Sequence, residues 1–185
     1  MTKQITEKRL YNITLFYLSK YESSSEKVRQ MLQRRLLKAS QQGIEIPDES
    51  QQWITKIIGQ MQSLGYINDK RYAENQVRIL SRQGKSKSFI VQKLRQSGID
   101  SETICTLLDD ESESDVQRAI LWLKRHKKGG FRLKTPDKEI YCKDLSALGR
   151  QGFSFQTAKK ALSESLKQIE TEVFELENFE NFNDF

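Results

Sequence analysis

One helix-ending pattern occurs twice in this chain, and its two glycines lie 54 residues apart. The first copy covers residues 94–100 and the second covers 148–154. Each begins with a leucine four residues before the glycine and ends on a polar residue two positions after it. Glycine can end a helix in the left-handed conformation, and Asp100 or Ser154 can cap the helix that follows. Repetition of this kind predicts stacked helical units rather than a single catalytic pocket.

Apolar residues recur at helical spacing as far as residue 169, and no segment alternates convincingly as a strand would. The capping-box pair Ser23 and Glu26 predicts the start of a helix that ends at Gly43, and Asp48 predicts the start of the next helix. We predict an all-α fold of three tandem three-helix repeats. The repeats are expected at residues 1–66, 67–110 and 111–169.

The formal net charge of +6 is unevenly distributed. Residues 170–185 carry six acidic side chains and no basic one, which leaves residues 1–169 with a net charge of +12. A body this basic favours a polyanion, or a partner with an acidic face. The acidic 170–185 tail also holds phenylalanines, and such a composition cannot bury a core alone, so we expect it to be disordered. Two roles are open for it: folding back over the basic body, or recruiting a basic partner.

The expected location follows from cysteine usage and from the absence of long apolar runs. Cys105 and Cys142 lack metal-ligand spacing and are expected to be buried free thiols, which suits a reducing compartment. The first residues lack the apolar core of a signal peptide. No stretch reaches the roughly 20 apolar residues of a membrane span. We therefore expect a cytoplasmic protein with no membrane contact. We also expect it to be a monomer.

No group of residues has the spacing of a catalytic or cofactor site. The segment 84–86 (Gly-Lys-Ser) lacks the strand and the earlier glycine of a phosphate-binding loop, because position 79 is Ile79. His126, the only histidine, gives no zinc spacing with the two cysteines. The acidic residues of 109–115 fit a charged linker better than a magnesium site. We expect no catalytic residue, no metal and no cofactor.

Four stretches combine glycine corners with amphipathic helices in a fixed order. They are Ser24–Arg29 with Leu32–Arg35, Gly65–Asp69 with Tyr72-Ala73, Gly84–Ser86 with Ile90, Leu94 and Gly98-Ile99, and Lys143–Leu145 with Arg150–Ser154. In this order and spacing, over roughly residues 8–165, the chain resembles the RecX family, the bacterial modulators of the RecA recombinase.

The resemblance implies an elongated, curved module of three tandem three-helix repeats. It also implies a mainly inhibitory regulator that binds along the deep groove of the RecA nucleoprotein filament and suppresses ATPase and strand exchange. DNA binding by the module itself is implied to be weak and mainly through phosphates. Two features depart from the family pattern: the loop at 43–47 is longer than a tight helical corner needs, and the 170–185 tail lies outside it.

Basic side chains recur at matching helical spacing in successive units, and they are the candidates for binding the filament or DNA. Residues at positions i, i+7 and i+11 lie on one face of a helix. Arg118 and Arg125, seven residues apart, repeat the first part of this spacing in the third unit. The basic run 124–134 can be interpreted either as a mobile arm that binds phosphates or as a helix end followed by a linker. Each set of basic residues on one helix face can alternatively be interpreted as an ordinary solvated face. The candidates are Lys27, Arg34 and Lys38; Arg71, Arg78 and Arg82; and Arg125, Lys127, Lys128 and Arg132.

Two other functional classes are weighed against this interpretation. A helix-turn-helix-like, sequence-specific DNA-binding regulator is suggested by the glycine corners, but residues 101–109 and 154–168 offer few base-reading side chains. The second class is an enzyme, and the sequence argues against it because no group of residues has the spacing of a catalytic site. Trp53 and Trp122 occupy apolar faces and are expected in the core, and no exposed aromatic surface for base stacking is evident.

Overall fold

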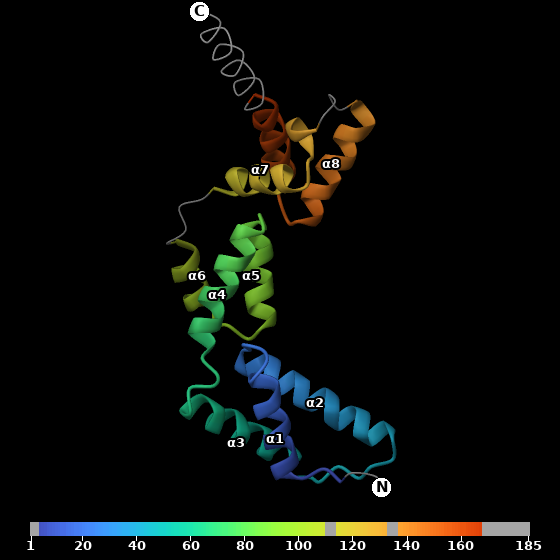
Figure 1. The fold of residues 1–185 in the computed structure, drawn as a ribbon, viewed down its shortest axis with the longest axis vertical. Coiled ribbons are helices and arrows are strands. Elements are labelled where there is room, and N and C mark those ends of the chain that lie inside the picture. Colours follow the sequence, from blue (N-terminus) through green and yellow to red (C-terminus); the bar gives the residue numbers. More distant parts are fainter. Residues whose placement is uncertain (1–3, 110–113, 133–136, 168–185) are drawn as a thin grey trace, which may run out of the picture. The chain divides into compact units, whose positions relative to one another are not determined.

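The structure, a computed structural model, describes residues 4–109, 114–132 and 137–167 of the 185-residue chain. Helices joined by short connections make up these residues, and none of them lies in a strand (Figure 1), which confirms the all-α prediction. The elements are α1 (Glu7–Leu18), α2 (Ser25–Gln41), α3 (Ser50–Ser63), α4 (Asp69–Arg82), α5 (Lys87–Gln96), α6 (Ser101–Asp109), α7 (Asp115–Arg125), the 3-10 helix η1 (Gly129–Phe131), α8 (Lys138–Arg150), and a further helical segment at 155–167.

The chain divides into two compact units. The first unit comprises Met1–Gln76 with Lys93–Thr106, and the second comprises Val77–Gln92 with Leu107–Phe185. The predicted disorder of the 170–185 tail lies outside the described residues.

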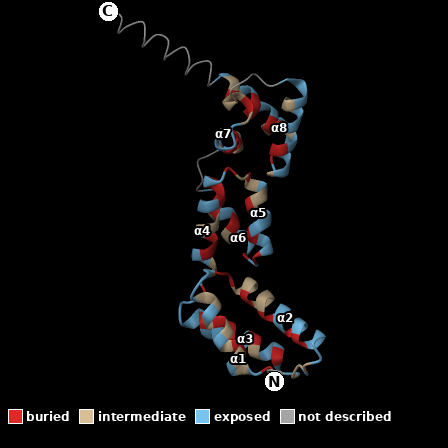
Figure 2. Cartoon of the chain, turned by 45° about the vertical axis from the view of Figure 1, so that its right-hand side comes forward, coloured by how far each residue is buried: buried red, intermediate tan, exposed pale blue. Residues whose placement is uncertain are grey.

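The core of the first unit is formed by α1, α2 and α3. Leu10, Leu32 and Ile57, one from each helix, have no exposed surface, and Figure 2 shows buried residues in all three helices. Burying one such side chain completely stabilises the folded chain by about 1.5–3 kcal/mol. Trp53 is half-buried and packs against this core, as predicted.

The second unit has its own core, to which α7, α8 and the 155–167 segment contribute. Leu123 and Leu148 have no exposed surface, and Leu162 is buried beside them in the same cluster. Trp122 is also buried, as predicted, and its ring stacks on His126 with a centroid separation of 4.2 Å. His126 therefore has a packing role.

The predicted helix corners are largely confirmed, because capping depends on local sequence. The Asp100 carboxylate accepts a hydrogen bond from Thr103 N at 2.8 Å, and Ser154 Oγ accepts one from Thr157 N at 3.1 Å. The predicted cap at Ser23 is wrong by one residue, since Ser24 Oγ accepts the bond that begins α2.

Two other local predictions are wrong. Helix α3 begins at Ser50 rather than at Asp48, and its N-cap residue, Glu49, makes no side-chain hydrogen bond. Cys105 and Cys142 are free, as predicted, but they are exposed rather than buried. For Cys105 the reason is visible in α6, where Ile104 turns inward and is buried, so that the next side chain along the helix points elsewhere.

A polar junction holds the N-terminal end of α2 in the first unit. Asp69, the first residue of α4, accepts a hydrogen bond from Ser25 N at 2.7 Å. Ser24 Oγ donates to the Ser97 carbonyl oxygen, also at 2.7 Å. The carboxylate thus satisfies a backbone N–H that the helix itself leaves unpaired, and the bond ties together segments that are distant in sequence.

The second unit contains an equivalent junction at the start of α5. Asp115, the first residue of α7, accepts a hydrogen bond from Lys87 N at 2.9 Å. Ser86 N donates to the Gln151 carbonyl oxygen at 3.4 Å. Asp115 therefore caps the first backbone N–H of α5 in the same way that Asp69 caps that of α2.

The two corner glycines complete these junctions. Gly98 has φ +76° and Gly152 has φ +87°, which confirms the left-handed conformation expected from the sequence. A β-carbon at Gly98 would lie 2.5 Å from Glu26 Cβ, and one at Gly152 would lie 2.5 Å from Ser86 Oγ. Each corner therefore packs directly on the helix start that its junction holds.

Because the same junction recurs with equivalent elements, we propose that the chain is built of three repeats. The first would hold α1–α3, the second α4–α6, and the third α7 and the helices after it. The proposed boundaries follow residues 66 and 110.

Candidate functional site

The candidate basic residues of α2 lie on the side of that helix away from the core. Arg34 and Lys38 are exposed, whereas Leu32 and Leu36 are buried. Lys27, one turn from the start of the helix, is half-buried, and its ammonium nitrogen lies 5.0 Å from the centre of the Tyr72 ring. Lys27 thus takes part in packing as well as carrying charge.

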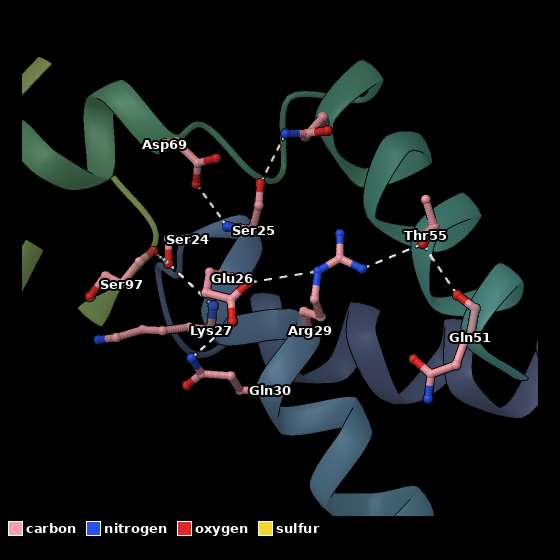
Figure 3. Close-up of polar contacts among 11 residues, drawn as sticks. Ser24, Ser25, Glu26, Lys27, Arg29, Gln30, Gln51, Thr55, Asp69 and Ser97 are labelled. Atoms are coloured by element: carbon pink, nitrogen blue, oxygen red, sulfur yellow. Dashed lines mark hydrogen bonds and ion pairs between the residues drawn. The ribbon is translucent and has the colours of Figure 1, made fainter. Parts of the chain in front are cut away.

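The polar residues around Lys27 are mainly structural (Figure 3). Arg29 reaches from α2 to Thr55 Oγ1 at 3.4 Å and lies 3.7 Å from the Glu26 carboxylate. Ser24 and Ser25 hold the junction with α4 and with the Ser97 carbonyl. The Ser24–Arg29 motif, one of those that carry the family resemblance, therefore builds the fold more than it presents a binding surface.

The three arginines of α4 are all exposed, as their spacing predicts. Arg71 donates from Nε to the Glu22 carboxylate at 2.9 Å, and the other oxygen of Glu22 accepts from Asn75 Nδ2 at 2.8 Å. The positive charge of Arg71 is therefore partly neutralised within the first unit. Arg78 and Arg82 are also exposed on this helix.

The basic stripe expected on α7 does not form. Arg118 is completely buried, with its guanidinium 3.7 Å from the Asp115 carboxylate. The buried neighbours Ala119 and Trp122 show that this side of the helix faces the core. Arg125 is exposed, and its guanidinium donates to the Arg82 carbonyl oxygen.

The described part of the basic run 124–134 is held in place by one buried carboxylate. Asp144, on α8, accepts hydrogen bonds from Lys128 Nζ at 3.0 Å, Gly129 N at 3.0 Å and Arg132 Nη2 at 2.7 Å. The Asp144 side chain is only 1% exposed. Lys127 remains exposed at a left-handed position, φ +50°. Sequence reasoning missed this role of Asp144, although the residue belongs to a stretch that resembles the family.

The surroundings of Asp144 favour its ionised form. Burial by itself raises the pKa of Asp144, but the hydrogen bonds from Arg132, the Gly129 amide and Lys128 outweigh it and hold the pKa below the ordinary aspartate value. The segment Lys128–Arg132 is thus attached to α8 by charge-assisted hydrogen bonds.

Acid is expected to weaken the second unit through Asp144. As the pH falls, the unfolded chain takes up a proton on this residue before the folded chain does. The stabilisation is therefore complete above the unfolded-state pKa of about 3.9 and is lost as the pH falls from there through the folded-state pKa. Urea unfolding at about pH 6 and about pH 3 measures this, and the wild type should lose more free energy of unfolding than Asp144→Asn. Equal losses would show that Asp144 does not contribute.

A groove in the first unit was not expected from the sequence. It has a volume of about 580 Å³ and is lined by aromatic residues of α1 and the turn after it, among them Phe16, Tyr17 and Tyr21. Phe16 is 64% exposed and Tyr21 is 60% exposed. No exposed aromatic surface for base stacking is evident from the sequence, and these exposed rings were missed.

The described residues offer no sign of metal chemistry or of a membrane span. No group of three or more histidine, cysteine or acidic side chains among them is arranged to hold a metal ion. No helix within the described ranges is both long enough and apolar enough to cross a bilayer.

Known proteins match both the sequence and the fold. A family model described as "RecX, second three-helix domain" matches residues 68–108, which covers α4 through most of α6. "Regulatory protein RecX" of Myxococcus xanthus is 29% identical over 163 residues, a match that covers 86% of this chain and 87% of that protein. "Regulatory protein RecX" of Agrobacterium fabrum is 33% identical over 104 residues, 56% of this chain and just 55% of that protein.

A solved structure agrees on the fold. The crystal structure of RecX from Lactobacillus salivarius superposes with a TM-score of 0.56 at 22% identity, over 88% of this chain and 97% of that one. The sequence matches and the matched three-helix domain make this chain similar to the RecX family over most of its length, and the solved structure shares its helical fold.

Proposed function

We propose that this protein is a cytoplasmic regulator, mainly an inhibitor, of the RecA recombinase. It binds as a monomer along the groove of the RecA–DNA filament, suppresses ATP hydrolysis and strand exchange, and performs no chemistry itself. Similarity to the RecX family supports a regulatory role, since the relatives are named regulatory proteins. The basic body of the chain supports a polyanionic or acidic target.

The observation that carries the proposal best is the exposure of basic side chains on helices α2 and α4. Arg34 and Lys38 project from α2, and Arg78 and Arg82 project from α4. Such groups can donate charge-assisted hydrogen bonds to DNA phosphates or to acidic side chains of filament subunits. A helical module bound in this way hinders the subunit movements that ATP turnover and pairing require.

The candidates differ in how much of their charge the fold already uses. Lys128 and Arg132 hold Asp144, and Arg71 pairs with Glu22. We therefore assign the leading part in binding to Arg34 and Lys38. A supporting part goes to Arg78, Arg82, Arg125, Lys127 and Lys27. The three cations that already pair with carboxylates, Arg71, Lys128 and Arg132, have a lesser part.

Neutralising the α2 cations is expected to weaken filament binding. The variant Arg34→Gln with Lys38→Gln should bind a RecA filament on single-stranded DNA about tenfold more weakly at about 0.1 M salt. The dependence of log K on log salt should become shallower by about 1–2, since up to two ionic contacts are lost. Fluorescence anisotropy of the labelled protein, titrated with filament at several salt concentrations, measures both quantities.

A matched control is available in Arg95→Gln with Lys159→Gln. Both residues are exposed and lie outside the candidate set, so the loss of net charge is equal while the proposed contacts stay intact. Equal weakening by the two variants would contradict the assignment to α2. Tight binding of the wild type to one duplex sequence, without RecA, would instead favour the helix-turn-helix alternative.

A further inference from the structure

The aromatic groove of the first unit combines exposed rings with positive charge. Phe16 and Tyr21 are more than half exposed, and Tyr17 lies beside Tyr21 with a ring separation of 5.5 Å. Exposed aromatic residues gathered in one concave place are unusual on a protein surface and mark an interaction site.

Cations surround these rings. Lys8, Arg9, Lys20 and Arg35 all line the groove, and none of its described lining residues is acidic. The Lys20 ammonium nitrogen lies 4.5 Å from the centre of the Phe16 ring. The groove therefore suits a ligand that carries carboxylates and aromatic rings together: the rings can stack on the aromatic wall, and the carboxylates can pair with the cations.

The chain itself contains such a segment. Residues 170–185 hold six acidic side chains, no basic one, and the four phenylalanines Phe174, Phe179, Phe182 and Phe185. Phenylalanine and acidic residues interleave along the segment, so one short stretch supplies both kinds of group. The charge of the segment is opposite to that of the groove.

We propose that the acidic 170–185 tail binds in the groove lined by Phe16, Tyr17 and Tyr21. Its phenylalanine rings contact the aromatic wall, and its carboxylates pair with the surrounding cations. Bound there, the tail covers an exposed aromatic surface and neutralises part of the positive charge of the first unit. This inference does not depend on RecA, because both components belong to this chain.

The test uses a full-length receptor whose own tail is disabled. Phe174, Phe179, Phe182 and Phe185 are all replaced by serine in the receptor, and a fluorescein-labelled peptide of residues 170–185 is titrated against it. We expect saturable binding in the micromolar range, about 10–100 µM at low salt, which weakens as salt screens the ion pairs.

The groove variant and its control decide where the peptide binds. Adding Phe16→Ser with Lys20→Glu to the receptor should weaken binding at least about tenfold, because one ring contact and one ion pair are lost and a repulsive charge is introduced. The control adds Leu64→Ser with Lys70→Glu, which likewise removes one exposed apolar side chain and reverses one exposed charge outside the groove. The control should change affinity by less than about threefold. Circular dichroism confirms that both receptors are folded.

Three results would overturn the proposal. One is equal binding by the groove variant and the control, and another is no saturable binding at peptide concentrations up to about 1 mM. The third is that Phe16→Ser with Lys20→Glu weakens the binding of a single-stranded thymidine oligonucleotide but leaves the binding of the peptide unchanged. The groove would then be a nucleic-acid site. In the full-length chain, restoring the four phenylalanines should shift the backbone amide resonances of Phe16, Tyr17 and Lys20, and unchanged resonances would count against the proposal.

Discussion

Replacing Asp144 by alanine is expected to lower the free energy of unfolding of the second unit by about 3–5 kcal/mol. The substitution removes a carboxylate that is almost fully buried and that accepts hydrogen bonds from Lys128, Gly129 N and Arg132. The Gly129 amide would be left without its partner in a buried position. Two cations would also lose the charge that holds them against α8. Breaking one side of a buried ion pair is among the most destabilising single changes a fold can undergo.

The matched control for Asp144 lies on the same helix. Glu139 also pairs with a cation, Lys143, at 2.6 Å, but its side chain is 75% exposed. Glu139→Ala should therefore change the free energy of unfolding by less than about 0.5 kcal/mol. Urea titrations followed by circular dichroism, and by tryptophan fluorescence in a Trp53→Phe background that leaves only Trp122 of the second unit, measure both variants. Similar small losses for the two variants would show that Asp144 does not hold the basic segment.

Gly98→Ala is expected to destabilise the first unit by about 3 kcal/mol or more. The left-handed backbone at φ +76° accounts for about 1 kcal/mol, because a side chain is disfavoured there. The remainder is steric, since the added β-carbon would lie 2.5 Å from Glu26 Cβ at the start of α2. The corner and α2 would have to separate, which also strains the Ser24–Ser97 hydrogen bond.

Gly65 separates the two causes experimentally. It also belongs to the first unit, ends α3 at φ +74°, and has no atom within 4 Å of the position that a β-carbon would take. Gly65→Ala should therefore cost only the conformational part, about 1 kcal/mol. The difference between the two variants in thermal or urea unfolding measures the close approach. Equal destabilisation would show that the corner relaxes without cost.

The features that could be predicted from the sequence depend on local chemistry. Left-handed glycines at 98 and 152, and helix caps at Asp100 and Ser154, follow from a few neighbouring residues, and the structure contains all four. Helix content follows from the 3.6-residue spacing of apolar side chains. Several hydroxyls adjoin at the start of α2, and the helix begins one residue later than a cap at Ser23 predicts.

The features that could not be predicted depend on contacts between distant segments. Asp144 is an ordinary surface-type residue in the sequence, and its burial arises only when the turn at Lys128–Arg132 folds onto α8. Arg118 shows the opposite error, because its spacing from Arg125 suggested a solvated stripe while the fold buries it beside Asp115. The groove at Phe16 and Tyr21 likewise has no local sequence signal, since it needs α1, the turn after it and α2 together.

The most direct test of the proposed regulation is ATP hydrolysis by the cognate RecA on single-stranded DNA, titrated with this protein from substoichiometric to equimolar ratios. We expect a progressive fall in the hydrolysis rate, no hydrolysis by this protein alone, and a weaker fall with Arg34→Gln and Lys38→Gln than with Arg95→Gln and Lys159→Gln. An unchanged rate with folded protein present at every ratio would contradict regulation of RecA by this chain.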